Sequence, residues 1–125
     1  MAETKGIFQA LTRTNMGGRD FVLNANMALS NCLAKGSFMT LTYLEIDLSA
    51  QTVDIMRAGH CQTLFYRAAT DELHSLESGG LGLAIMRNDT FGNFLPEPER
   101  VHFEAGDFIV LFTDGIIEAH NAERE

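Results

Sequence analysis

The stretch FIVLFTDG, residues 108–115, decides more about the fold than any other part of this chain. Its short apolar run, rich in Ile, Val and Phe, predicts a buried β-strand. Asp114 follows at the end of that strand, where a carboxylate can leave the core, and Gly115 permits a sharp turn. Hard divalent cations bind such carboxylate oxygens. On this stretch alone, Asp114 is either a metal ligand or an ordinary aspartate in a turn.

The composition limits what the rest of the chain can be. A length of 125 residues suits a single domain, and 46% hydrophobic with 21% charged residues is enough to bury a core. The formal net charge of −8 argues against nucleic acid or an anionic membrane surface as a partner, since both attract clustered Lys and Arg. No apolar run approaches the ~20 residues needed to span a bilayer. Two cysteines without a secretory signal indicate reduced thiols in a cytoplasmic protein.

The apolar spacing changes along the chain from a helical to a strand period. Two helices are expected first, over residues 2–14 and 20–34, with Asp20 as the N-cap of the second helix and Gly36 as its stop. Strands are then expected at residues 38–47, 52–57, 63–67 and 73–76. Their connections are too short for crossover helices, so neighbouring strands should be antiparallel. A further short strand is expected near residues 90–95, and a hairpin turn at 105–107 between strands 101–104 and 108–113.

Five motifs in order, FMTLTYLEIDL, MRAGH, GLGLAI, AGDFIVLFTDG and IIEAHN, resemble one known family. This family is the metal-dependent serine/threonine protein phosphatases (PPM), in the SpoIIE/RsbU-type branch, and the resemblance covers residues 2–121. It implies an α+β fold with antiparallel sheets and flanking helices, most of a four-layer α/β/β/α sandwich. Residues 1–125 would then form one partial domain, truncated at its N-terminus and lacking its final segment.

The resemblance also implies an activity and a site. The family hydrolyses phosphoserine or phosphothreonine on a regulatory protein, such as an anti-sigma-factor antagonist, in bacterial signal transduction. Its aspartate in the TDG motif is a ligand of a binuclear manganese or magnesium centre, which assigns that role to Asp114. Three neighbouring residues are then candidates for orienting the Asp114 carboxylate without binding the metal: Thr113, Gly115 and Glu118. Glu118 is equally suited to capping the following turn.

Three other residues invite a catalytic interpretation that the sequence does not support. His60 ends the Ala58-Gly59-His60 motif without an identifiable carboxylate partner or nucleophile, so a structural, hydrogen-bonded histidine is expected. Asn26, in the second helix, is expected to pack or to form hydrogen bonds. Asp107 follows Gly106, and a role in the turn is favoured over a ligand role.

The departures from the family decide what this chain can do alone. The family begins with strands that carry a Gly-Asp motif and an Asp-x-x-Gly-His-Gly motif, whose acids bind the metals, and this sequence has no counterpart of those leading strands. The family also has a further acid after the helix that follows TDG, and this chain ends before it. We therefore expect this chain alone to be inactive, and a non-catalytic partner-binding module on the same scaffold remains the alternative. A sheet that lacks its leading strands has an open edge, so a homo-oligomer is also expected.

Overall fold

The computed structural model describes residues 2–77, 79–87 and 89–120. The chain divides into two compact units. Unit 1 contains residues 1–60 and 78–103, and unit 2 contains residues 61–77 and 104–125. Both units combine helix with antiparallel strands, as expected of an α+β protein. No helix in the described ranges is long and apolar enough to cross a membrane.

Unit 1 is a three-stranded antiparallel sheet with two long helices. Its elements are α1 (Ala2–Thr12), α2 (Gly18–Cys32), β1 (Leu41–Asp47), β2 (Thr52–Ala58), the 3₁₀ helix η1 (Asp89–Phe94) and β5 (Glu99–His102). The strand order is β1-β2-β5, so β2 lies between the other two. In this register Leu44 lies opposite Ile55, and Asp54 lies opposite Arg100.

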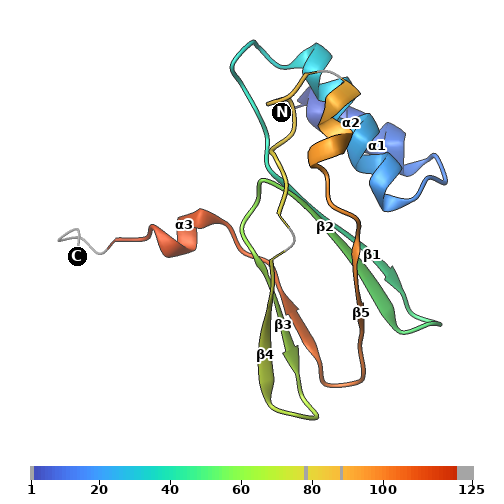
Figure 1. Ribbon diagram of the computed structural model, residues 1–125, viewed down its shortest axis with the longest axis vertical. Helices are drawn as coiled ribbons and strands as arrows, with labels where there is room; N and C mark the ends of the chain where they lie inside the picture. The colour runs from blue at the N-terminus through green and yellow to red at the C-terminus, as the bar shows by residue number, and fades with distance from the viewer. Residues whose placement is uncertain (1, 78, 88, 121–125) are drawn as a thin grey trace. The chain divides into compact units, whose positions relative to one another are not determined.

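The helices of unit 1 pack in sequence, α1 against α2 and α2 against β1 and β2 (Figure 1). The ring of Phe8 in α1 stacks on Phe21 in α2 at 5.9 Å between centroids, and Phe21 meets Tyr43 of β1 at 4.8 Å. The helical spacing of the α2 residues Phe21, Val22, Ala25 and Leu29 places them in the core, with Met56, Ala58, Leu83, Ala84, Phe91 and Leu95. Cys32, at the end of the helix, is exposed.

Unit 2 is smaller and has a sheet of its own. Its elements are β3 (Thr63–Arg67), β4 (Glu72–Leu76), β6 (Phe108–Val110) and the short α3 (Asp114–Ile117). The strand order is β4-β3-β6, again antiparallel throughout. Phe65 and Thr63 of the central strand are buried, and Tyr66 stacks on Phe108 across the β3–β6 pair at 5.7 Å.

The strand predicted from FIVLFTDG is shorter and less buried than expected. β6 covers only Phe108–Val110, and the side chains of Phe108 and Val110 are 61% and 45% exposed. The physical reason lies in its position, because β6 is an edge strand with β3 as its one neighbour in the described sheet. The apolar run is therefore an edge, and its continuation through Leu111 and Phe112 has no strand pairing in the described residues.

The hairpin predicted at residues 105–107 is wrong. A turn does form there, with the Asp107 N–H donating to the Glu104 carbonyl at 3.1 Å and Gly106 at φ +97°. However, β5 pairs with β2 and β6 pairs with β3, so the turn joins strands of two different sheets. Turn chemistry fixes a local reversal but not the partner of the strand that follows it.

Two element boundaries and one element type also differ from the expectation. The N-cap of α2 is Gly17 and not Asp20, which lies inside the first turn. The first strand begins at Leu41, preceded by a single antiparallel bridge between Met39 and Leu83. The expected strand near residues 90–95 is the 3₁₀ helix η1, whose Phe91 is buried. Two apolar residues, such as Phe91 and Phe94, fit one turn of a helix as well as a short strand. The packing of Phe91 in the core of unit 1 favours the helix.

Candidate functional site

The TDG turn connects β6 to α3 in unit 2. Thr113 has extended backbone angles, φ −104° and ψ 163°, and is the N-cap residue of α3 without a side-chain cap hydrogen bond. Asp114 is the first residue of α3, and its carbonyl accepts the Glu118 N–H at 2.8 Å. A Cβ atom on Gly115 would lie 3.4 Å from the Thr113 Oγ1, which is an ordinary contact. Gly115 is therefore not sterically required by the described part of the chain.

The four residues proposed for the site are brought together by this one turn. Thr113, Asp114, Gly115 and Glu118 are all exposed. The four-residue spacing of Asp114 and Glu118 places their side chains on the same side of a helical turn. Glu118 is the C-cap residue of α3, so its backbone already has the capping role that the sequence left open. Within the described residues, no hydrogen bond or ion pair engages the Asp114 carboxylate.

The described residues do not by themselves fit a binuclear metal centre. In residues 2–77, 79–87 and 89–120, no group of three or more His, Cys, Asp or Glu side chains could hold a metal ion. Hard divalent cations take six or more oxygen ligands and keep their hydration shells against a single carboxylate. The described chain therefore supplies Asp114 as an isolated donor.

Asp107 behaves as the sequence predicts, as a turn residue. Its carboxylate accepts the Ala68 N–H at 2.9 Å and the Glu104 N–H at 2.8 Å. These two backbone hydrogen bonds, with a smaller contribution from Arg67 at 3.8 Å, lower the pKa of Asp107 below its usual value. Both oxygens are occupied in tying together two turns of unit 2, so this carboxylate is committed to structure.

His60 has the hydrogen bond that the sequence predicts for it. Its Nδ1 lies 2.9 Å from the Thr40 Oγ1, and its carbonyl accepts from the Arg57 guanidinium at 2.8 Å. The preceding Gly59 has φ +69° and lies against Gly82, whose amide nitrogen would be 2.7 Å from a Cβ atom on Gly59. The Ala58-Gly59-His60 motif therefore forms a close backbone contact with the glycine-containing loop before Leu83.

Asn26 holds the same loop from the helix side. It is 3% exposed, its Oδ1 accepts the Ala84 N–H at 2.8 Å, and its Nδ2 donates to the Met86 carbonyl at 3.1 Å. Ala84 has φ +66°, a left-handed conformation that costs a non-glycine residue about 1 kcal/mol. The paired hydrogen bonds satisfy the buried backbone there and stabilise that conformation.

Arg87 has a structural role that the sequence did not reveal. All five of its N–H donors meet main-chain carbonyls, at 2.8 to 3.1 Å, on Ser30, Leu33, Ala34, Ser37 and Ala84. The carbonyls at the end of α2 have no partners within the helix, and a cation there is favoured by the helix dipole. No local pattern could have predicted this cap, because Arg87 and Ser30 are 57 residues apart in sequence.

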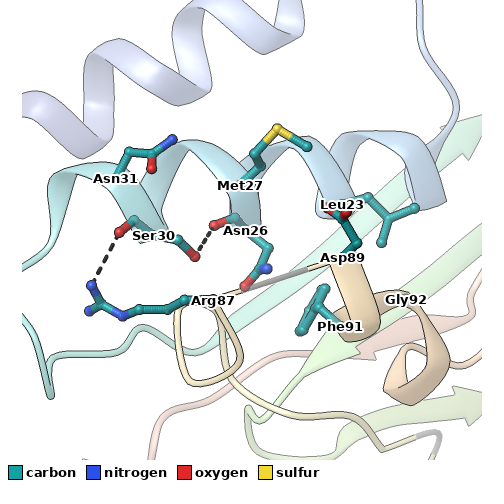
Figure 2. A pocket seen from close by; sticks show the side chains of 9 residues that line it. All are labelled: Leu23, Asn26, Met27, Ser30, Asn31, Arg87, Asp89, Phe91 and Gly92. Carbon is teal, nitrogen blue, oxygen red and sulfur yellow. Dashed lines mark hydrogen bonds between the residues drawn. The ribbon is translucent and has the colours of Figure 1, made fainter.

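A cavity of about 290 Å³ lies in unit 1 between α2 and the segment that contains η1 (Figure 2). Residues of α2 form one wall, and Arg87 with residues of η1 forms the other. The described lining residues are Leu23, Asn26, Met27, Ser30, Asn31, Arg87, Asp89, Phe91 and Gly92. Figure 2 shows the guanidinium of Arg87 turned toward Ser30, while Asp89 lies beside Leu23. No local sequence pattern predicts this cavity, because its two walls come from distant segments.

Comparison with protein families gives a match along the whole chain. Residues 1–125 match the family described as Stage II sporulation protein E (SpoIIE). The phosphoserine phosphatase RsbU of Bacillus subtilis (strain 168) is 26% identical over 118 residues, which cover 94% of this chain and 34% of RsbU. The chain thus spans about a third of the length of that relative.

Solved structures show the same fold. The PP2C phosphatase domain of the cell fate determinant SpoIIE from Bacillus subtilis, with a fragment of its regulatory domain, matches with a TM-score of 0.70 and 19% identity. That match covers 94% of this chain and 33% of the other. The manganese-soaked phosphatase domain of the same protein matches with a TM-score of 0.55 and 19% identity, over 98% of this chain and 51% of that one.

Proposed function

The chain belongs to the SpoIIE family, and we propose that it is part of a metal-dependent protein serine/threonine phosphatase domain. The match of all 125 residues to the family carries this proposal. The fold supports it, because PP2C phosphatase domains are its structural neighbours. The exposed TDG turn supports it further, since Asp114 is held at a helix start with no competing partner in the described residues.

The proposed substrate is a phosphorylated regulatory protein. RsbU is a phosphoserine phosphatase by name, so phosphoserine is the first choice, with phosphothreonine as the second. An anti-sigma-factor antagonist is the kind of protein that the family resemblance implies. Such a regulator works in the cytoplasm, and the proposal places this domain there as well. Residues 1–125 would form one partial domain in this scheme.

Asp114 is proposed as one oxygen ligand of a manganese or magnesium ion. Because the described residues hold no further cluster of ligands, the remaining donors of a complete centre would have to come from elsewhere in the protein. Thr113, Gly115 and Glu118 would then support Asp114 by setting the geometry of the turn. A complete ligand set in the native gene would favour the enzyme, and its absence from that gene would favour the second candidate, a partner-binding module without catalysis.

Phosphatase assays on two proteins test these alternatives. The protein encoded by the whole open reading frame and the 125-residue chain are each incubated with p-nitrophenyl phosphate and a phosphoserine peptide in excess manganese. We expect turnover by the longer protein, abolished by EDTA, and none by the 125-residue chain. A folded longer protein that neither turns over substrate nor binds manganese would establish the binding module instead.

A further inference from the structure

The cavity that α2 forms with Arg87 and η1 has a size that suits one side chain. Its volume of about 290 Å³ lies just below the range of roughly 300 to 1,000 Å³ that is usual for small-molecule pockets. A nucleotide or a large cofactor would not be enclosed by it. A single long side chain from another protein would be.

The polar groups on the inner side of the cavity are already engaged. Both polar atoms of the Asn26 side-chain amide form hydrogen bonds with the backbone of residues 84 and 86. The Ser30 hydroxyl donates to the main-chain carbonyl of Asn26 at 2.6 Å. All five donors of Arg87 are used on carbonyls. An anionic group entering the cavity would therefore find no free donor on Arg87, although this is the one cationic side chain among the described lining residues.

Two polar side chains of the lining remain available. Asp89 and Asn31 are exposed, and neither carboxylate nor amide has a hydrogen bond or ion pair with another described residue. Asp89 presents an acceptor with full negative charge, and it lies beside Leu23 at the side away from the guanidinium of Arg87 (Figure 2). Leu23, Met27 and Phe91 provide apolar walls, and methionine adapts readily to a guest of irregular shape.

We propose that this cavity is a socket for one basic side chain, lysine or arginine, of a partner protein. The aliphatic stem would lie against Leu23, Met27 and Phe91, and the cationic end would meet the Asp89 carboxylate. Charge complementarity supports this occupant at two levels. The local acceptor is Asp89, and the whole chain carries a net charge of −8, which attracts a basic partner over a longer range. The proposal stands whether or not the domain is catalytic.

Methyl NMR of Met27 tests the socket in the 125-residue chain. The protein is labelled at its methionine methyl groups and titrated with N-acetyl-arginine amide, N-acetyl-lysine amide and N-acetyl-citrulline amide. Citrulline has nearly the shape of arginine without its charge. We expect saturable shifts of the Met27 methyl with both cationic amides, and at least about five-fold weaker binding of the citrulline amide. Met56, a core residue outside the lining, serves as the internal control.

Two variants distinguish binding at Asp89 from nonspecific attraction of cations to an acidic protein. Asp89→Asn should weaken the binding of the cationic amides by about five-fold or more. Asp20 is an exposed acid of α2 outside the lining, and Asp20→Asn should change the affinity by less than about two-fold. Amide spectra of both variants check that each is folded. Equal binding of the arginine and citrulline amides, or no effect of Asp89→Asn, would overturn the proposal. Tighter binding of spermidine than of either amide would assign the cavity to a small polyamine and overturn the partner-protein assignment.

Discussion

Gly59 and Gly82 lie so close together that a Cβ atom on Gly59 would be 2.7 Å from the Gly82 amide nitrogen and 2.9 Å from its Cα. Gly59 has φ +69°, and Gly82 has the Met39 carbonyl 3.1 Å from where its own Cβ would be. The end of β2 and the loop before Leu83 are thus in direct backbone contact. Position 59 requires glycine for this approach, because a Cβ atom there would clash with the backbone of Gly82 and the residue has a left-handed conformation.

Gly59→Ala should destabilise unit 1 by about 2–4 kcal/mol, because it adds left-handed strain to a clash with backbone that cannot rotate away. Urea unfolding followed by circular dichroism measures the change. Gly6→Ala is the matched control, since Gly6 lies inside α1 with nothing within 4 Å of its Cβ position. There alanine should be neutral or stabilise by up to about 1 kcal/mol. Similar effects of the two substitutions would contradict the close contact.

Asn26→Leu should cost about 2–4 kcal/mol of unfolding free energy. It leaves the buried Ala84 N–H and the Met86 carbonyl without partners while keeping the side-chain volume similar. Asn31→Leu on the exposed side of the same helix should change stability by no more than about 0.5 kcal/mol. Hydrogen exchange at the Ala84 amide adds a local measurement. Unchanged protection of that amide in Asn26→Leu would show that the asparagine does not hold the loop.

Stability should fall at acid pH through carboxylates with lowered pKa values. Backbone hydrogen bonds lower the pKa of Asp107, and the Arg100 hydrogen bond lowers that of Asp54. A depressed carboxyl pKa contributes stability fully above the unfolded value of about 3.9 and loses it as the pH falls through the folded pKa. Urea unfolding between pH 7 and pH 3 should show this loss, and Asp107→Asn should reduce it. Parallel pH profiles for the variant and the wild type would refute the role of Asp107.

Asp114→Asn in the protein encoded by the whole open reading frame should lower the phosphatase rate by at least ~100-fold, comparable to the loss of one essential electrostatic group. It keeps the shape but removes a charged oxygen donor, so manganese affinity measured by calorimetry should fall with it. His60→Ala is the comparison, and it should mainly lower thermal stability through loss of the Thr40 contact. Full activity in Asp114→Asn, with inactivity in a well-folded His60→Ala, would reverse these roles.

The 125-residue chain should self-associate through the edge of its unit 1 sheet. β1 has β2 as its one neighbour in that described sheet, and Phe38, Ile46 and Leu48 in and beside it are exposed. Open edges with apolar side chains recruit further strands. Sedimentation equilibrium across a wide concentration range should show a dimer or larger species, and Ile46→Lys should shift it toward monomer. A stable wild-type monomer at high concentration would count against an open edge.

Elements that depend on neighbouring residues could be predicted from the sequence. Helical and strand periods located both helices and the strands β1 to β4 to within a few residues, and short connections made them antiparallel. The turn at Gly106 and the hydrogen-bonding role of Asn26 were also predicted from the sequence. Each of these is set by interactions a few positions apart, which a periodic pattern records directly.

The contacts that join distant segments could be seen only in the folded chain. It paired β5 with β2 and β6 with β3, where the local turn had predicted a hairpin. It placed the apolar run FIVLF at an exposed edge and brought Arg87 to the end of α2. It also opened the cavity beside Asp89. These outcomes depend on packing and hydrogen bonds between residues that are far apart in the chain. A local sequence pattern does not specify which distant residue pairs with a strand edge, binds a carbonyl or covers an apolar face.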